Sequence, residues 1–180
     1  MRIPFKTSAA LLTLLALSGC ASFAPRMSAQ ECMARAMYFE SNRSSEEGMV
    51  AVGTVVMNRV ESREFPDTVC GVVGQKNQFA PGVLTKRMDK GRDLAFATAD
   101  KVLNGTRHGW VGDRAMFFHT AGYSFPYKNM HYVAILGGNS FYEKRRDAWM
   151  TQDMVAERQR EAANRSQDGF FSFLDPFDVF

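Results

Sequence analysis

Apolar residues in the first half of the chain recur at helical spacing. Residues 30–41 contain no Gly or Pro, and their apolar side chains follow a helical period, which predicts an amphipathic helix. A second helix is predicted from residue 44, where Ser44 and Glu47 have the spacing of a capping box. It should end before Pro66, because the residue before a proline disfavours helix. Residues 93–105 predict a third helix, closed by Asn104-Gly105.

The second half of the chain has a different pattern. Residues 67–75 are expected to form a short apolar turn, and residues 76–93 a loop. Residues 115–127 and 131–143 are short aromatic and β-branched runs broken by Gly and Pro, which predicts strands of a small antiparallel sheet. Residues 146–180 begin with a polar stretch of helical charge spacing, predicted as a solvated helix or partly disordered tail. The tail ends in "FFSFLDPFDVF", which either folds back over an exposed patch or docks on a membrane or protein partner.

Helices followed by a small sheet predict an α+β domain, with a cleft between a helical lobe and a β lobe. A chain of 180 residues with 46% hydrophobic residues is typical of one globular domain. Its formal charge of +3 includes Arg2 and Lys6, so removal of the N-terminal segment leaves +3 − 2 = +1. No basic stripe is present, so no nucleic-acid partner is predicted.

The N-terminus has the pattern of an export signal. A short basic start precedes an apolar run too short to span a bilayer, which predicts a signal peptide over residues 1–19. "LSGC" resembles a bacterial lipobox, so we expect a lipid anchor on Cys20 and a tether over residues 20–30. No Asp follows Cys20, which favours the periplasmic face of the outer membrane. The alternative is an ordinary signal peptide with an incidental cysteine.

Two cysteines remain after Cys20. An exported protein folds where disulfides persist, so Cys32 and Cys70 are predicted to pair. The alternative is that both are small buried apolar residues. No CxxC spacing is present, so no metal site and no cofactor are predicted.

Glu40 is the candidate catalytic residue. It ends the first predicted helix, where the helix dipole disfavours negative charge, and it follows the apolar run Met37-Tyr38-Phe39. Burial there would raise the pKa of its carboxyl, as a general acid at neutral pH requires. A solvated glutamate at a helix end is the alternative.

The stretch "AMYFESNRSSEEGMVAVGTVVMNRV" resembles the paired helices of the SleB/CwlJ-type cell-wall hydrolases. The family pattern is similar to "FPDTVCGVVGQKNQFA", "AMFFHTAG" and "GGNSFYEK" as well, in the same order, over roughly residues 31–145. Where the family has further Gly, Glu and His residues, this chain has Arg43, Ser44 and Asn139, which puts the level of activity in doubt.

The resemblance implies a lysozyme-like fold that cleaves peptidoglycan, with Glu40 as general acid. It places a set of polar and aromatic residues along the cleft as the binding surface for glycan strands: Gln78, Phe79, Phe118, His119, Tyr127, Asn139 and Tyr142. Each aromatic residue could instead belong to the core.

The absence of a convincing acid partner for Glu40 favours a lytic transglycosylase over two-carboxylate hydrolysis. Two rival functions stay open. One is a zinc amidase, for which the three histidines offer no HxxxH or HxxE spacing. The other is a non-catalytic peptidoglycan-binding lipoprotein.

Overall fold

The structure is a computed structural model that describes residues 27–41 and 45–173. The signal segment, Cys20, Arg43, Ser44 and residues 174–180 lie outside this range, so the predicted lipid anchor, the role of the aromatic C-terminus and the effect of Arg43 and Ser44 on activity are not tested by it.

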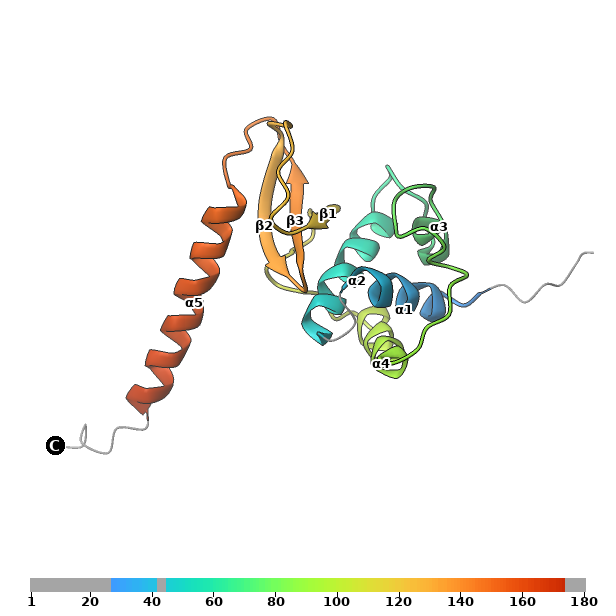
Figure 1. Ribbon diagram of the computed structural model, residues 1–180, viewed down its shortest axis with the longest axis horizontal. Helices are drawn as coiled ribbons and strands as arrows, with labels where there is room; N and C mark the ends of the chain where they lie inside the picture. The colour runs from blue at the N-terminus through green and yellow to red at the C-terminus, as the bar shows by residue number, and fades with distance from the viewer. Residues whose placement is uncertain (1–26, 42–44, 174–180) are drawn as a thin grey trace, which may run out of the picture.

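The first half of the chain forms a helical lobe. It consists of α1 (Ala29–Glu40), α2 (Glu46–Glu61), α3 (Val69–Val73) and α4 (Arg92–Leu103), as Figure 1 shows. The periodic apolar residues of α1 are buried as predicted, and they pack against α2, α3 and α4. Each fully buried Met or Val side chain here contributes roughly 1.5–3 kcal/mol to stability. This packing fixes the C-terminal end of α1, which carries Glu40.

The start of α2 corrects one prediction. Ser45 is the N-cap, and its side chain accepts a hydrogen bond from the N–H of Gly48 at 3.1 Å. The capping box of Ser44 and Glu47 is therefore wrong, because Glu47 is the second residue of the helix rather than the third. The helix itself and its C-terminal end agree with the prediction.

The segment expected to be an apolar turn contains the short helix α3. Thr68 is its N-cap and accepts a hydrogen bond from the N–H of Gly71. Cys70 on this helix is joined to Cys32 on α1 by a disulfide, with their Cα atoms 5.2 Å apart. The bond ties two helices that are 38 residues apart in sequence.

The second lobe is an antiparallel sheet of three strands. β1 (Phe117–Thr120), β2 (Met130–Leu136) and β3 (Asn139–Lys144) lie in the order β1-β3-β2, with an irregularity between Tyr132 and Ala134 where β2 pairs with β3. One face of the sheet packs on α2 through a second apolar cluster: Ala51, Val52, Val55, Val111, Ala115, Ala134, Leu136 and Phe141. Because α2 also contributes Met49 and Val56 to the helical core, it is the element that both lobes share.

Two glycines allow the lobes to meet beside Glu40. A Cβ atom placed on Gly48 of α2 would lie 2.7 Å from the Cα of Gly137, in the turn between β2 and β3. Gly137 also has a positive φ of 55°, which L side chains rarely adopt. The close backbone contact brings the first residue of β3 to the end of α1.

A long helix follows the sheet. α5 (Gln152–Phe173) lies on the side of the sheet away from the helical lobe and extends beyond it (Figure 1). Arg158 donates to the carbonyl of Val133 at 2.5 Å, and Gln159 accepts from the N–H of Ile135 at 3.0 Å, so α5 pairs with polar groups of the edge strand β2. Within the described part of the chain, none of the helices is long and apolar enough to span a bilayer.

Candidate active site

Glu40 is the last residue of α1 and is half-buried. Its Oε1 accepts a hydrogen bond from the backbone N–H of Ala80 at 2.5 Å. Burial raises the pKa of the Glu40 carboxyl, whereas the Ala80 N–H and the positive charge of Arg59 lower it, and burial prevails. The carboxyl therefore keeps its proton to a higher pH than a free glutamate, as a general acid must.

Arg59 lies near Glu40 in the interior and is only 3% exposed. Its Nε donates to the carbonyl of Met116 at 2.7 Å, and its Nη1 is buried with no hydrogen-bond partner among the described residues. The guanidinium carbon is 5.0, 5.4 and 5.7 Å from three ring centres, those of Phe65, Phe79 and Phe117. Burial lowers the pKa of Arg59 to about 10, so it stays charged at neutral pH and supports the ionised form of Glu40.

No role was predicted for Arg59 from the sequence. The signal was the polar pair Asn58-Arg59 on a helix that is otherwise mainly apolar from Met49 to Met57. Asn58 donates to the carbonyls of Gly112 and Ala115, at 3.0 and 2.9 Å. Together the two side chains hold the turn that leads into β1.

Asn139 was predicted to bind substrate, but its amide is directed to the protein. It is 7% exposed, and its Nδ2 donates to the backbone carbonyl of Glu40 at 2.5 Å. The carbonyls in the last turn of a helix have no partner within the helix. Asn139 satisfies one of them and fixes the β lobe to the residue that carries the acid.

The outer face of the sheet is lined by aromatic rings. Phe117 and Tyr142 are opposite each other in the β1–β3 register and stack with their centres 5.5 Å apart. Burial raises the pKa of the Tyr142 phenol, and the charge of Arg59 acts against it. The aromatic face thus meets Arg59 through Phe117, whose ring centre lies 5.7 Å from the guanidinium carbon.

His119 belongs to the same face, but the protein occupies both of its ring nitrogens. Nδ1 lies 2.8 Å from the carbonyl of Thr120, and Nε2 lies 2.9 Å from the hydroxyl of Tyr132. Because a carbonyl only accepts, Nδ1 donates to Thr120. The Tyr132 hydroxyl lies within reach of both Nε2 and Met130 Sδ, which is 3.7 Å away, and has one proton for the two. His119 therefore holds Tyr132 in place.

The other predicted binding residues do not form one surface. Phe79 is 9% exposed and belongs to the helical core, which was the alternative stated for each aromatic residue. Gln78 beside it is exposed. Phe118 is half-buried and packs against Phe79 and Phe141. Tyr127 is exposed and lines a cavity on the outer side of the sheet. The structure thus brings Asn139 to the backbone of Glu40 and places Phe79 next to Ala80 and 5.4 Å from Arg59. His119 lies beside Tyr142, with ring centres 5.8 Å apart.

The acids that follow Glu40 have other partners. Glu46 pairs with Lys101 at 2.5 Å, and Glu47 lies 3.4 Å from Nε2 of His108. Within residues 27–41 and 45–173, no group of three or more His, Cys, Asp or Glu side chains is placed to hold a metal ion.

The helical lobe, the antiparallel sheet and the sheltered acid between them define a lysozyme-like α+β domain. The chain belongs to the cell wall hydrolase family, whose sequence profile matches residues 43–142, more than half of its length. That match begins three residues after Glu40 and therefore does not include it.

Known proteins resemble this chain in sequence and in structure. A spore cortex-lytic enzyme from Bacillus cereus is 36% identical over 92 residues, which are 49% of this chain and 34% of that protein. One from Oceanobacillus iheyensis is 45% identical over 49 residues, 27% of this chain and 18% of that protein. The chain thus matches about a third of the length of one of these curated relatives and less of the other.

Solved structures of two catalytic domains share the fold. The catalytic domain of Bacillus cereus SleB superposes with a TM-score of 0.54 at 26% identity, covering 64% of this chain and 89% of that one. The catalytic domain of the germination-specific lytic transglycosylase SleB from Bacillus anthracis gives a TM-score of 0.53 at 26% identity, covering 66% and 98%.

Proposed function

We propose that this chain is a lytic transglycosylase that cuts the β-1,4 bond after N-acetylmuramic acid in peptidoglycan, with Glu40 as its single acid and base. The observation that carries the proposal is the half-buried Glu40 carboxyl, whose pKa burial raises. Membership of the cell wall hydrolase family supports the substrate class. The likeness to a domain described as a lytic transglycosylase supports the type of reaction.

In the proposed reaction, protonated Glu40 donates its proton to the glycosidic oxygen. The bond from that oxygen to the anomeric carbon of the muramyl sugar breaks, and the sugar passes through an oxocarbenium-like state. The Glu40 carboxylate then removes the proton from the C6 hydroxyl of the same sugar. Oxygen 6 bonds to the anomeric carbon, which gives a 1,6-anhydro end, consumes no water and returns Glu40 to its protonated form.

The environment of Glu40 suits both steps. Burial favours the neutral acid before cleavage. The Ala80 N–H and the Arg59 cation favour the carboxylate that exists between the two proton transfers. Burial and these two groups act on the Glu40 pKa in opposite directions, so the site offers support to both the acid and the carboxylate.

The test is release of soluble muropeptides from purified peptidoglycan by wild-type protein and by Glu40→Gln. Removal of a general acid should lower the rate about 10²–10⁴-fold. Glu47→Gln is the matched control, because Glu47 is an exposed glutamate seven residues along, and its release rate should stay at the wild-type value. Equal release by wild type and Glu40→Gln contradicts the proposal. Loss of release on treatment with EDTA favours the zinc amidase instead.

We further propose that the domain is held at the periplasmic face of the outer membrane by a lipid on Cys20. The support is the lipobox-like "LSGC" after an apolar run, together with the absence of Asp at the next position. Cys20 lies outside the described residues.

A further inference from the structure

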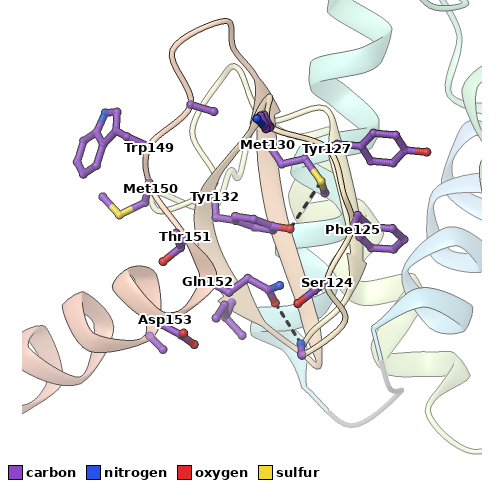
Figure 2. A pocket seen from close by; sticks show the side chains of 15 residues that line it. Ser124, Phe125, Tyr127, Met130, Tyr132, Trp149, Met150, Thr151, Gln152 and Asp153 are labelled. Atoms are coloured by element: carbon purple, nitrogen blue, oxygen red, sulfur yellow. Dashed lines mark hydrogen bonds between the residues drawn. The ribbon is translucent and has the colours of Figure 1, made fainter.

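A second feature of the structure is a cavity of about 700 Å³ on the outer side of the sheet. Its walls are the β1–β2 connection and the segment that joins β3 to α5, and Tyr132 lies between them (Figure 2). Its volume is within the range of ligand pockets, roughly 300–1,000 Å³. The wall formed by residues 148–153 lies beyond the stretch matched by the family profile.

Exposed aromatic rings gather at this cavity. Seven large apolar side chains are exposed among the described residues, and three of them line it: Phe125 at 45%, Tyr127 at 67% and Trp149 at 61%. The rings of Phe125 and Tyr127 are stacked, with their centres 6.3 Å apart and their planes 14° from parallel. A cluster of solvent-exposed aromatic side chains is typical of a binding surface.

The walls are held by hydrogen bonds and ring contacts. The carbonyl of Met150 accepts from the N–H of Tyr132 at 3.1 Å, so the segment that carries Trp149 pairs with β2. The Trp149 ring meets the buried His131 ring edge-on, with centres 5.4 Å apart. Gln152 joins the walls, because its Oε1 accepts from the Gly122 N–H at 3.1 Å. The cavity is therefore preformed, which reduces the entropic cost of binding.

The chemistry of the lining fits a sugar chain. A pyranose presents C–H groups on its faces and hydroxyls at its rim, so flat aromatic rings combined with hydroxyl and amide groups bind it well. Here Tyr127 and Trp149 supply the exposed rings, whereas Ser124, Thr151 and Gln152 supply the polar groups.

Ring contacts connect the cavity to the aromatic face of the sheet. Its residue Tyr132 bonds to His119 and lies 5.7 Å, ring to ring, from Tyr142. Tyr142 stacks on Phe117, whose ring centre lies 5.7 Å from the guanidinium carbon of Arg59. Aromatic rings thus extend along the sheet from Arg59 to the cavity.

We infer that the cavity between Trp149 and Tyr127 is a distal subsite for the β-1,4-linked, N-acetylated glycan strand, outside the cleavage site. The inference rests on the proposed function, because the strand bound there is the strand that Glu40 cleaves. It gives this chain a preference for long strands that a domain without residues 148–153 lacks.

Binding is tested directly by the fluorescence of Trp149. The chain has two tryptophans, so Trp110→Phe leaves Trp149 as the reporter, and Glu40→Gln in the same protein prevents cleavage. Titration with the β-1,4-linked tetramer of N-acetylglucosamine should give a saturable change, and adding Tyr127→Ala should weaken the affinity about fivefold or more. The matched control is Trp149→Phe in the Glu40→Gln background, which keeps Trp110 outside the cavity and should give no saturable change.

The result that overturns the inference is an unchanged Trp149 signal over the whole titration. A saturable response to the free stem peptide, with none to the sugar tetramer, also overturns it and assigns the cavity to peptide. This assay does not depend on turnover. If Glu40→Gln still releases muropeptides, that result contradicts the proposed mechanism but does not bear on the subsite.

A kinetic measurement tests the strand-length preference. The ratio of kcat/KM for long glycan strands to kcat/KM for peptidoglycan tetrasaccharides should fall about fivefold or more in Trp149→Ala. It should stay at the wild-type value in Trp110→Ala, whose ring packs under Arg158 outside the cavity. An unchanged ratio in Trp149→Ala contradicts the subsite.

Discussion

At the scale of single residues, the proposed mechanism depends on the groups that raise and lower the pKa of Glu40. Burial stabilises the protonated carboxyl, and the Ala80 N–H and Arg59 stabilise the ionised one. No single partner fixes the state of the acid. The balance explains how one glutamate can act as acid and base, and it makes the pH dependence of the reaction sensitive to Arg59.

Arg59→Met tests this balance. Removing the cation leaves burial less opposed, so the pKa of Glu40 rises further. Activity that needs protonated Glu40 is lost as pH rises through this pKa, so the alkaline limb of the kcat/KM profile should move to higher pH. Arg59→Lys keeps the charge and should move the limb less. An alkaline limb that stays in place or moves to lower pH in Arg59→Met contradicts the assignment of Glu40 as the general acid.

The sequence predicted part of this site. The place of Glu40 after an apolar run at a helix end predicted its partial burial, and the resemblance to the SleB/CwlJ-type hydrolases implied its catalytic role. Its partners could not be found this way, because Ala80 and Arg59 reach it only through the packing of a loop and of α2. Asn139 was assigned to substrate for the same reason, since its bond to Glu40 spans 99 residues of sequence.

At the scale of elements, the pattern of apolar residues predicted the main helices and strands. This prediction was wrong at the start of α2 and at α3, where the capping residue determines the structure. Ser45 caps α2 rather than Ser44, and the supposed turn forms α3, with Thr68 as its cap. Neighbouring serines offer equal capping chemistry, and a five-residue helix is too short to show a period.

The contact between Gly48 and Gly137 predicts the effect of a single methyl group. Gly48→Ala places a Cβ 2.7 Å from the backbone of Gly137, which must move. We expect a loss of roughly 1–3 kcal/mol in the free energy of unfolding, measured by urea denaturation. Activity should fall as well, because the shift moves Asn139 from Glu40. Gly109→Ala is the control, since a Cβ there meets nothing within 4 Å, and a similar loss in both variants contradicts the contact.

The disulfide between α1 and α3 should contribute substantially to stability. Its partners are 38 residues apart in sequence, for which the loop-entropy model gives about 4 kcal/mol. The double variant Cys32→Ala and Cys70→Ala should therefore unfold at lower urea than the oxidised wild type. Wild type treated with reductant should approach the double variant. Equal midpoints for oxidised and reduced wild type would show that the bond does not stabilise the fold.

At the scale of the whole molecule, the predicted α+β class with two lobes is confirmed by the structure and by the SleB catalytic domains. The arrangement of α5 was not predicted, because a polar helical pattern does not show which strand edge it meets. The cavity on the outer sheet face was not foreseen for the same reason, although Tyr127 was named as a binding residue. Its walls come from two connections whose meeting depends on the tertiary fold.

The anchor on Cys20 also belongs to this scale. Cys20→Ser removes the thiol that takes the lipid, so the protein should move from the detergent phase to the aqueous phase in Triton X-114 partitioning. Mass spectrometry of the N-terminal peptide should find diacylglycerol in wild type only. A wild-type protein found entirely in the aqueous phase, with an unmodified N-terminus, contradicts the lipoprotein proposal.

The most direct test of the central claim is the mass of the fragments released from purified peptidoglycan. If the Glu40 carboxylate regains its proton from the muramyl C6 hydroxyl, every new end is a 1,6-anhydro sugar. Each fragment then weighs one water less than the reducing form. Glu40→Gln should release none of these fragments above background. Reducing ends from wild type, or anhydro ends made equally well by Glu40→Gln, would contradict the single-acid mechanism.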